Sequence, residues 1–237
     1  MDSLENQILK LSKIAVVNND YKEVEKELQL IGRMLVTDYV IKIGNITIEP
    51  LWVEAYYSNV AKEFADPFIH GKEEQSEFGI LYFHHKTDDS RSGVDICLSL
   101  CDETKNKYYL SYLLKYTLVN GEFTTQSQLS AKIRKAYDSL PNKNDILEMS
   151  CNKSETDILG YTTRIGLNVK ESDVEKEMKK RYASLNLAIA KNFDKTYSIE
   201  KKLPHIESLA YSFLSTYDFD KEKWCKEHLG YCLKNIK

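Results

Sequence analysis

The sequence predicts an α+β fold, a single domain in which a central, mostly antiparallel and curved sheet is flanked by N- and C-terminal helices. Two patterns predict it. Apolar residues recur at helical spacing towards both ends of the chain, and short alternating stretches typical of strands gather between them. The chain has 237 residues, of which 42% are hydrophobic, so one sizeable core can be buried. We assign 1–237 to this domain, with a helical segment over 1–36, a mixed core over 37–190 and helices over 191–237.

The N-terminal segment is expected to form two helices. Apolar residues repeat every three or four positions on either side of Asn18-Asn19-Asp20, whose residue types favour turns and helix caps. The apolar positions are Leu4, Ile8, Leu11 and Ile14 before this break, and Val24, Leu28, Ile31 and Leu35 after it.

From residue 39 the apolar period indicates strands, and the turn residues Gly44-Asn45 indicate a hairpin. Pro50 cannot donate to a β-ladder, so we expect an edge or a bulge there. The expected strands cover 39–43, 46–49, 51–57, 79–84, 92–100 and 108–118, with a long surface loop over 58–78 and a charged turn over 86–91.

The second half is expected to return to helices. The predicted elements are a helix over 126–140 ended by Pro141, a polar connection over 141–157, a strand over 160–169, a helix over 172–183, and terminal helices over 206–216 and 221–233. The stretch 182–190 fits either a helix or a strand.

Composition narrows the class of protein. No apolar run approaches the ~20 residues that span a bilayer, and the polar N-terminus lacks the pattern of a secretory signal, so we expect a cytoplasmic protein with no membrane partner. Five cysteines without CxxC spacing and the adjacent pair His84-His85 indicate no metal. The net charge of −3 counts against a nonspecific nucleic-acid binder, although it allows a local basic patch. We expect a monomer with no cofactor.

Polar residues cluster where the expected strands end. Four pieces carry them: Glu54-Ala55-Tyr56, the loop from Asp66 to His70, Tyr82-Phe83-His84, and Arg91 to Asp95. Consecutive elements usually lie side by side, so these pieces are expected to converge on one cleft.

The order of these motifs resembles the alkyladenine (3-methyladenine) DNA glycosylases. The similarity covers residues 33–190. Its later part includes three further segments, Leu113-Leu114-Lys115-Tyr116, Arg164-Ile165-Gly166-Leu167 and Lys180-Arg181-Tyr182. The chain departs from that family at Leu81 to His85 and in the longer charged turn from Lys86 to Arg91. It also has no asparagine on the strand over 92–100, no Gly-Pro-x-Lys-Leu segment and no basic excess.

The resemblance implies a monofunctional DNA glycosylase, active in DNA repair or anti-phage defence. Such an enzyme flips a modified base out of DNA and leaves an abasic site. Glu54 would deprotonate the water that attacks C1′ of the deoxyribose. The flipped base would stack on Tyr56, His70 and Tyr82 or His84, and Arg91 would hold a phosphate or a base edge.

Two charged residues lie within apolar strands and need partners if they are buried. Asp95 is expected to pair with Arg91, either as an anchor or as a second catalytic acid or base. Arg164 also needs a partner if it is buried, and we include it among the substrate-binding candidates.

Each assignment has a structural alternative. Glu54 can face water on its strand, Tyr56 and Tyr82 can be packing residues, and Asp66 before Pro67 is a natural turn starter. The alternative function is a catalytically inactive, glycosylase-like module that binds nucleic acid or protein. A third hypothesis is an interaction protein whose motif matches are fortuitous.

Overall fold

The computed structural model describes residues 3–84, 93–100, 107–139, 148–151, 159–164, 167 and 176–191. The chain divides into two compact units, one of Met1–Glu155 with Tyr161–Ile189 and the other of Thr156–Gly160 with Ala190–Lys237. Almost all of the second unit lies outside the described residues, and so do the helices expected over 206–216 and 221–233. The first unit contains the sheet and the candidate site.

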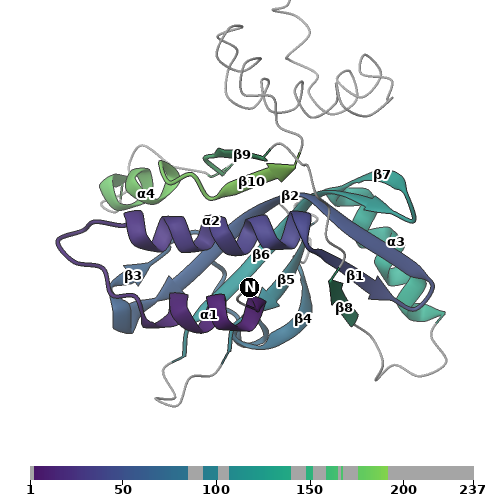
Figure 1. Cartoon of the computed structure of the whole chain (residues 1–237), viewed down its shortest axis with the longest axis horizontal. Helices are drawn as coiled ribbons and strands as arrows, with labels where there is room; N and C mark the ends of the chain where they lie inside the picture. Colours follow the sequence, from purple (N-terminus) through teal and green to yellow (C-terminus); the bar gives the residue numbers. More distant parts are fainter. Residues whose placement is uncertain are drawn as a thin grey trace, which may run out of the picture. The chain divides into compact units, whose positions relative to one another are not determined.

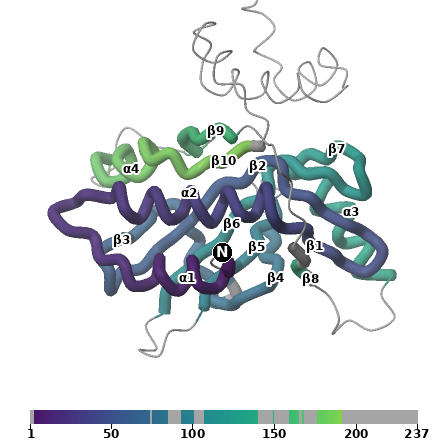
Figure 2. The backbone as a smooth tube through the Cα atoms, viewed as in Figure 1, coloured from purple at the N-terminus to yellow at the C-terminus, as the bar shows by residue number. Residues whose placement is uncertain are grey.

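The first unit is built on a mostly antiparallel sheet (Figures 1 and 2), which confirms the predicted α+β fold. Its main path runs β4-β5-β6-β2-β1-β8, while β3 and β10 also pair with β2 and β7 pairs with β6. The strands are β1 Tyr39–Ile43, β2 Ile46–Asn59, β3 Phe64–Ala65, β4 Phe78–Phe83, β5 Val94–Leu98, β6 Tyr109–Val119, β7 Glu122–Thr125, β8 Glu148–Cys151, β9 Leu159–Thr162 and β10 Ala188–Lys191.

Two helices, α1 (Leu4–Lys13) and α2 (Lys22–Thr37), lie across one face of the sheet (Figure 1), as the sequence predicts. Between them Asn18 and Asn19 adopt positive φ, a conformation that asparagine tolerates better than most residues. The helices bury their apolar stripes, and tyrosine hydroxyls fix them to the sheet. Tyr57 donates to the Leu11 carbonyl (3.4 Å), and Tyr112 donates to the Leu28 carbonyl (2.8 Å).

Successive side chains of a strand point to opposite faces of the sheet, which separates the tyrosines that contact the helices from the polar residues next to them. Tyr57 and Tyr112 point to the helices, so their neighbours along each strand point away from α1 and α2. That second face carries Glu54 and Tyr56 of β2, which pair with Leu113 and Ser111 of β6. Glu54 and Tyr56, both singled out in the sequence, therefore lie on the face turned away from α1 and α2.

The long β2–β6 ladder contains two irregularities that cancel. Trp52 pairs with Tyr116 and Val53 pairs with Leu114, so Lys115 of β6 has no Cα partner in β2. On the other strand, Leu51 is the residue without a Cα partner, one position after Pro50. The bulge expected at Pro50 is confirmed, and its counterpart at Lys115 was not foreseen.

Several elements differ from the sequence-based expectation. The stretch 58–78 is more ordered than a surface loop, because β3 pairs with β2 and is flanked by the 3₁₀ turns Val60–Lys62 and Glu73–Ser76. β7 forms a hairpin with β6 through Asn120-Gly121, both at positive φ. β8, inside the expected polar connection, pairs with β1. The ambiguous stretch resolves into β10, which pairs with β2.

Helices α3 (Gln126–Asp138) and α4 (Lys176–Ala183) confirm the predicted later helices. A capping box at Thr125 and Gln128 starts α3, which supplies partners for backbone donors that the first turn leaves unpaired. Among the described residues, none of the helices combines the length and the apolar character that crossing a bilayer requires.

The buried tyrosines that contact α1 and α2, Tyr57 and Tyr112, predict how the stability of the fold falls at alkaline pH. Burial raises the pKa of Tyr112 and of Tyr57 above the ordinary value, and for Tyr57 the hydrogen bond from Asn59 opposes the shift. Because the folded pKa exceeds the unfolded pKa of about 10, the stabilisation is complete below pH ~10 and is lost as the pH rises above it.

We therefore expect the free energy of unfolding, measured by urea denaturation, to fall steeply above pH 10. Tyr112→Phe should lower stability by about 1 kcal/mol at pH 7, because the Leu28 carbonyl loses its donor. The same variant should lose less stability above pH 10 than the wild type. An unchanged alkaline slope would mean that Tyr112 ionises without unfolding the chain.

Candidate active site

Two buried carboxylates stand in one row across four strands. Glu54 on β2 and Asp95 on β5 both pair with Leu113, which lies between them on β6. Tyr82 on β4 pairs with Asp95 and extends the row to the next strand. Because neighbouring strands are spaced by ~4.8 Å, the Cα atoms of the two acidic residues lie about 10 Å apart.

Glu54 is held by a hydroxyl and a cation. Its side chain has no exposed surface, and its Oε2 accepts a hydrogen bond from the Tyr56 hydroxyl at 3.3 Å. Lys115 Nζ lies 3.6 Å from the same oxygen. Burial raises the pKa of Tyr56 well above its ordinary value, the charge of Glu54 raises it further, and Arg164 opposes both. Tyr56 therefore stays protonated at neutral pH and remains a donor to the carboxylate.

Asp95 uses both oxygens to orient its neighbours. Ser111 Oγ donates to Oδ2 at 2.9 Å, and His84 Nε2 lies 2.7 Å from Oδ1. An ionised Asp95 requires the proton of a neutral His84 to reside on Nε2, which leaves Nδ1 as the unprotonated ring nitrogen. His84 retains 15% of its side-chain exposure, so this pair connects a buried charge to the surface.

The expected pairing of Asp95 with Arg91 involves a residue outside the described ranges. Among the described residues, Asp95 forms hydrogen bonds with His84 and Ser111. Ser111 was not a candidate in the sequence, because a serine in an apolar strand has no distinguishing signal.

Three rings form a rim at the outer end of the acidic row. His84 packs against His70 with ring centroids 4.7 Å apart and against Tyr82 at 5.3 Å. His70 Nδ1 lies 3.3 Å from the Tyr82 hydroxyl. His70 is exposed, and Tyr82 and His84 are partly exposed. The rim therefore presents flat polar–aromatic surfaces next to Asp95.

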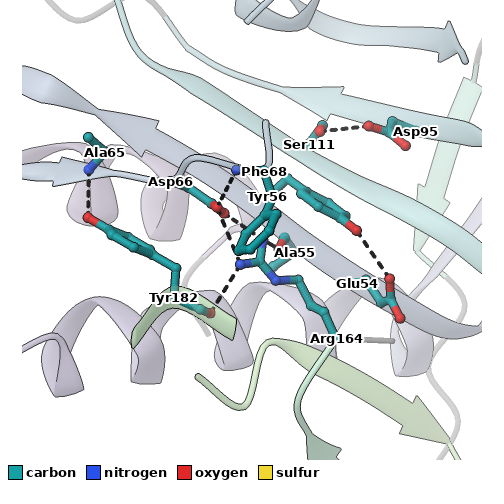
Figure 3. Close-up of polar contacts among 10 residues, drawn as sticks. All are labelled: Glu54, Ala55, Tyr56, Ala65, Asp66, Phe68, Asp95, Ser111, Arg164 and Tyr182. Atoms are coloured by element: carbon teal, nitrogen blue, oxygen red, sulfur yellow. Dashed lines mark hydrogen bonds and ion pairs between the residues drawn. The ribbon is translucent and has the colours of Figure 1, made fainter. Parts of the chain in front are cut away.

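A second charge pair lies beneath Tyr56. Arg164 Nη1 contacts Asp66 Oδ2 at 2.5 Å, and neither side chain has any exposed area. The same guanidinium donates to the carbonyls of Ala55 and Tyr182, both at 3.2 Å. Its Cζ lies 4.8 Å from the ring centroid of Tyr56 (Figure 3). Arg164 therefore joins β2, the loop after β3 and α4.

Arg164, one of the substrate-binding candidates, lies inside the protein in this structure. Its guanidinium has no exposed surface, and Asp66 and the two carbonyls already accept hydrogen bonds from it. Asp66 also shapes the loop, as expected of a turn starter before Pro67, by accepting a hydrogen bond from the Phe68 N–H at 3.0 Å. Arg164 and Asp66 are positioning residues, which place the Tyr56 ring over the charge pair.

The described residues bring together most of the predicted site. Glu54, Tyr56, Tyr82 and Asp95 lie on one face, with His84 on Asp95 and His70 against His84. Sequence reasoning missed Lys115 as a partner of Glu54, since its alternation on β6 is broken by the bulge. Within the described ranges, no group of three or more potential ligands is placed to hold a metal ion.

No protein-family model matches the chain, and no curated protein matches it at a significant level.

Gly93 sets how closely His84 approaches the row. A Cβ at this position would lie 2.9 Å from His84 Cδ2, Leu113 Cδ1 and Gln126 Nε2, while the Gly93 carbonyl accepts a hydrogen bond from the His84 N–H. We expect Gly93→Ala to displace the His84 ring from Asp95. The ring resonances of His84 in an NMR spectrum at fixed pH should therefore move relative to wild type, and unchanged resonances would contradict the displacement.

The Asp66–Arg164 pair predicts a large loss of stability on removing one partner. Asp66→Asn leaves the guanidinium buried without a counter-charge, which should cost about 3–5 kcal/mol in urea denaturation. Glu122→Gln removes the partner of Lys132 at an exposed ion pair and should cost under about 1 kcal/mol. Equal losses in the two variants would contradict the assignment of Asp66 as an anchor.

Proposed function

We propose that this chain is a DNA N-glycosylase, which flips out and excises a modified base and leaves an abasic site. The base would be alkylated or hypermodified, as repair or defence against phage DNA requires. The carrying observation is the pair of carboxylates on one sheet face, Glu54 and Asp95, with an aromatic rim beside them. The ordered resemblance to the alkyladenine DNA glycosylases supports the same proposal.

The rim suits a base that has left the duplex. A glycosidic bond inside the base stack is out of reach of protein side chains, so the nucleotide must rotate out and find new stacking partners. The rings of His70, Tyr82 and His84 provide such faces at the outer end of the row. A base lying there would have its sugar directed along the row towards Glu54.

The two carboxylates support different steps. Glu54 acts as the general base, taking a proton from the water that attacks C1′ as the bond from C1′ to the base nitrogen breaks. The Tyr56 hydroxyl and Lys115 hold the carboxylate in place. On the side of the departing base, Asp95 orients His84, and a protonated His84 donates a proton to the base as it leaves.

One observation favours the alternative, a catalytically inactive module. Glu54 has no exposed side-chain surface, and both Tyr56 and Lys115 already contact one of its oxygens. In this alternative the carboxylate serves to neutralise Lys115. In that case the aromatic rim would still bind a base or a peptide, but no bond would be broken.

Base release separates the two functions. Purified protein is incubated with duplexes carrying a panel of alkylated and hypermodified bases, and abasic sites are counted after alkaline cleavage. We expect wild type to form abasic sites with at least one duplex, and Glu54→Gln to be slower by about 10²–10⁴-fold. The isosteric amide retains the volume of the buried side chain.

Two controls accompany this measurement. Glu122→Gln changes an exposed carboxylate that pairs with Lys132 and should keep the wild-type rate. Thermal melting of Glu54→Gln establishes that the variant is folded, since it leaves Lys115 without its counter-charge. DNA binding by the wild type without release of any base would favour the inactive module.

A further inference from the structure

We propose that Lys115 is a nucleophile that captures the abasic product as an imine and cleaves the DNA strand beside it. The site would then be a glycosylase with lyase activity, in place of the monofunctional enzyme that the sequence resemblance implies. This inference rests on the proposed function in one respect, that the aldehyde it captures is formed at Glu54.

The β-bulge gives Lys115 an unusual position on its strand. It is the extra residue of β6 between the Trp52–Tyr116 and Val53–Leu114 pairs. Bulges redirect side chains and occur often beside active sites. Here the amine lies 3.6 Å from Oε2 of Glu54, at the β2 end of the row that also contains Asp95.

The surroundings of Lys115 suit an amine that reacts with a carbonyl. Its side chain is 19% exposed, whereas Glu54 has no exposure, so the lysine is the more accessible member of the pair. Lysine amines attack aldehydes once a neighbouring group removes a proton, and Glu54 is placed to accept it. An ordinary surface lysine such as Lys132, 36% exposed and paired with Glu122, has no buried base beside it.

The chemistry balances without a cofactor. The ring-opened deoxyribose presents an aldehyde at C1′. The Lys115 nitrogen bonds to C1′, and the carbonyl oxygen leaves as water with protons that pass through Glu54. The imine acidifies C2′, from which Glu54 removes a proton. The C3′–O bond then breaks, and its electron pair leaves with the phosphate. Addition of water to the imine releases an unsaturated aldehyde and restores the amine.

Borohydride trapping tests the inference on a duplex that already carries one abasic site. This substrate bypasses base excision, so the outcome does not depend on glycosylase activity. Borohydride reduces an imine to a stable amine, which joins protein and DNA covalently. We expect an adduct with wild type, located at residue 115 by peptide mass spectrometry, together with strand cleavage when borohydride is omitted.

The decisive variant is Lys115→Arg, which keeps the positive charge beside Glu54 and removes the amine. We expect loss of both the adduct and the strand cleavage, while Lys132→Arg retains both. Absence of an adduct with wild type, or an adduct that persists in Lys115→Arg, would overturn the inference. Release of bases without a borohydride adduct would support the proposed glycosylase and contradict the lyase activity. Trapping without base release would leave a lyase and remove the glycosylase.

Discussion

The site depends on the buried contact between Arg164 and Asp66. The guanidinium binds a carboxylate and two backbone carbonyls, so it connects β2, the loop after β3 and the end of α4. Fully buried charges are costly unless every partner is in place, and this cost makes the arrangement specific. The Tyr56 ring lies against the same guanidinium, and its hydroxyl reaches Glu54. The position of Glu54, the candidate general base, therefore depends on the buried contact between Arg164 and Asp66.

The sheet face turned away from α1 and α2 combines two buried carboxylates, which would repel each other and lose hydration without partners. Each instead has its own partners. Glu54 contacts Tyr56 and Lys115, whereas Asp95 contacts His84 and Ser111. The intervening Leu113 separates them by a strand. Because their partners differ, the two acidic groups are positioned for different roles.

The fold was largely predictable because its signals are local. Helical spacing located α1 and α2, and Pro50 indicated a bulge. Weaker local signals hid β7 and β8, whose strands depend on their partners β6 and β1. In the site, the spacing of polar residues indicated which side chains gather, but not what they contact. Alternation could not place Lys115 beyond a bulge, and no residue near Arg164 in the sequence indicated that Asp66 would be its partner.

The paired irregularities in β2 and β6 also bear on how this chain can change over evolution. Ile48 pairs with Val119 and Tyr56 pairs with Ser111, so the two strands have equal numbers of residues between these points despite a bulge in each. Losing Leu51 or Lys115 alone would shift one strand past the other by a position. The carboxylate row would then turn towards α1 and α2, and the tyrosines that fix those helices would turn away. Length variation is therefore tolerable here only when both strands vary together, so any lineage descended from this chain should keep or lose the two bulges as a unit.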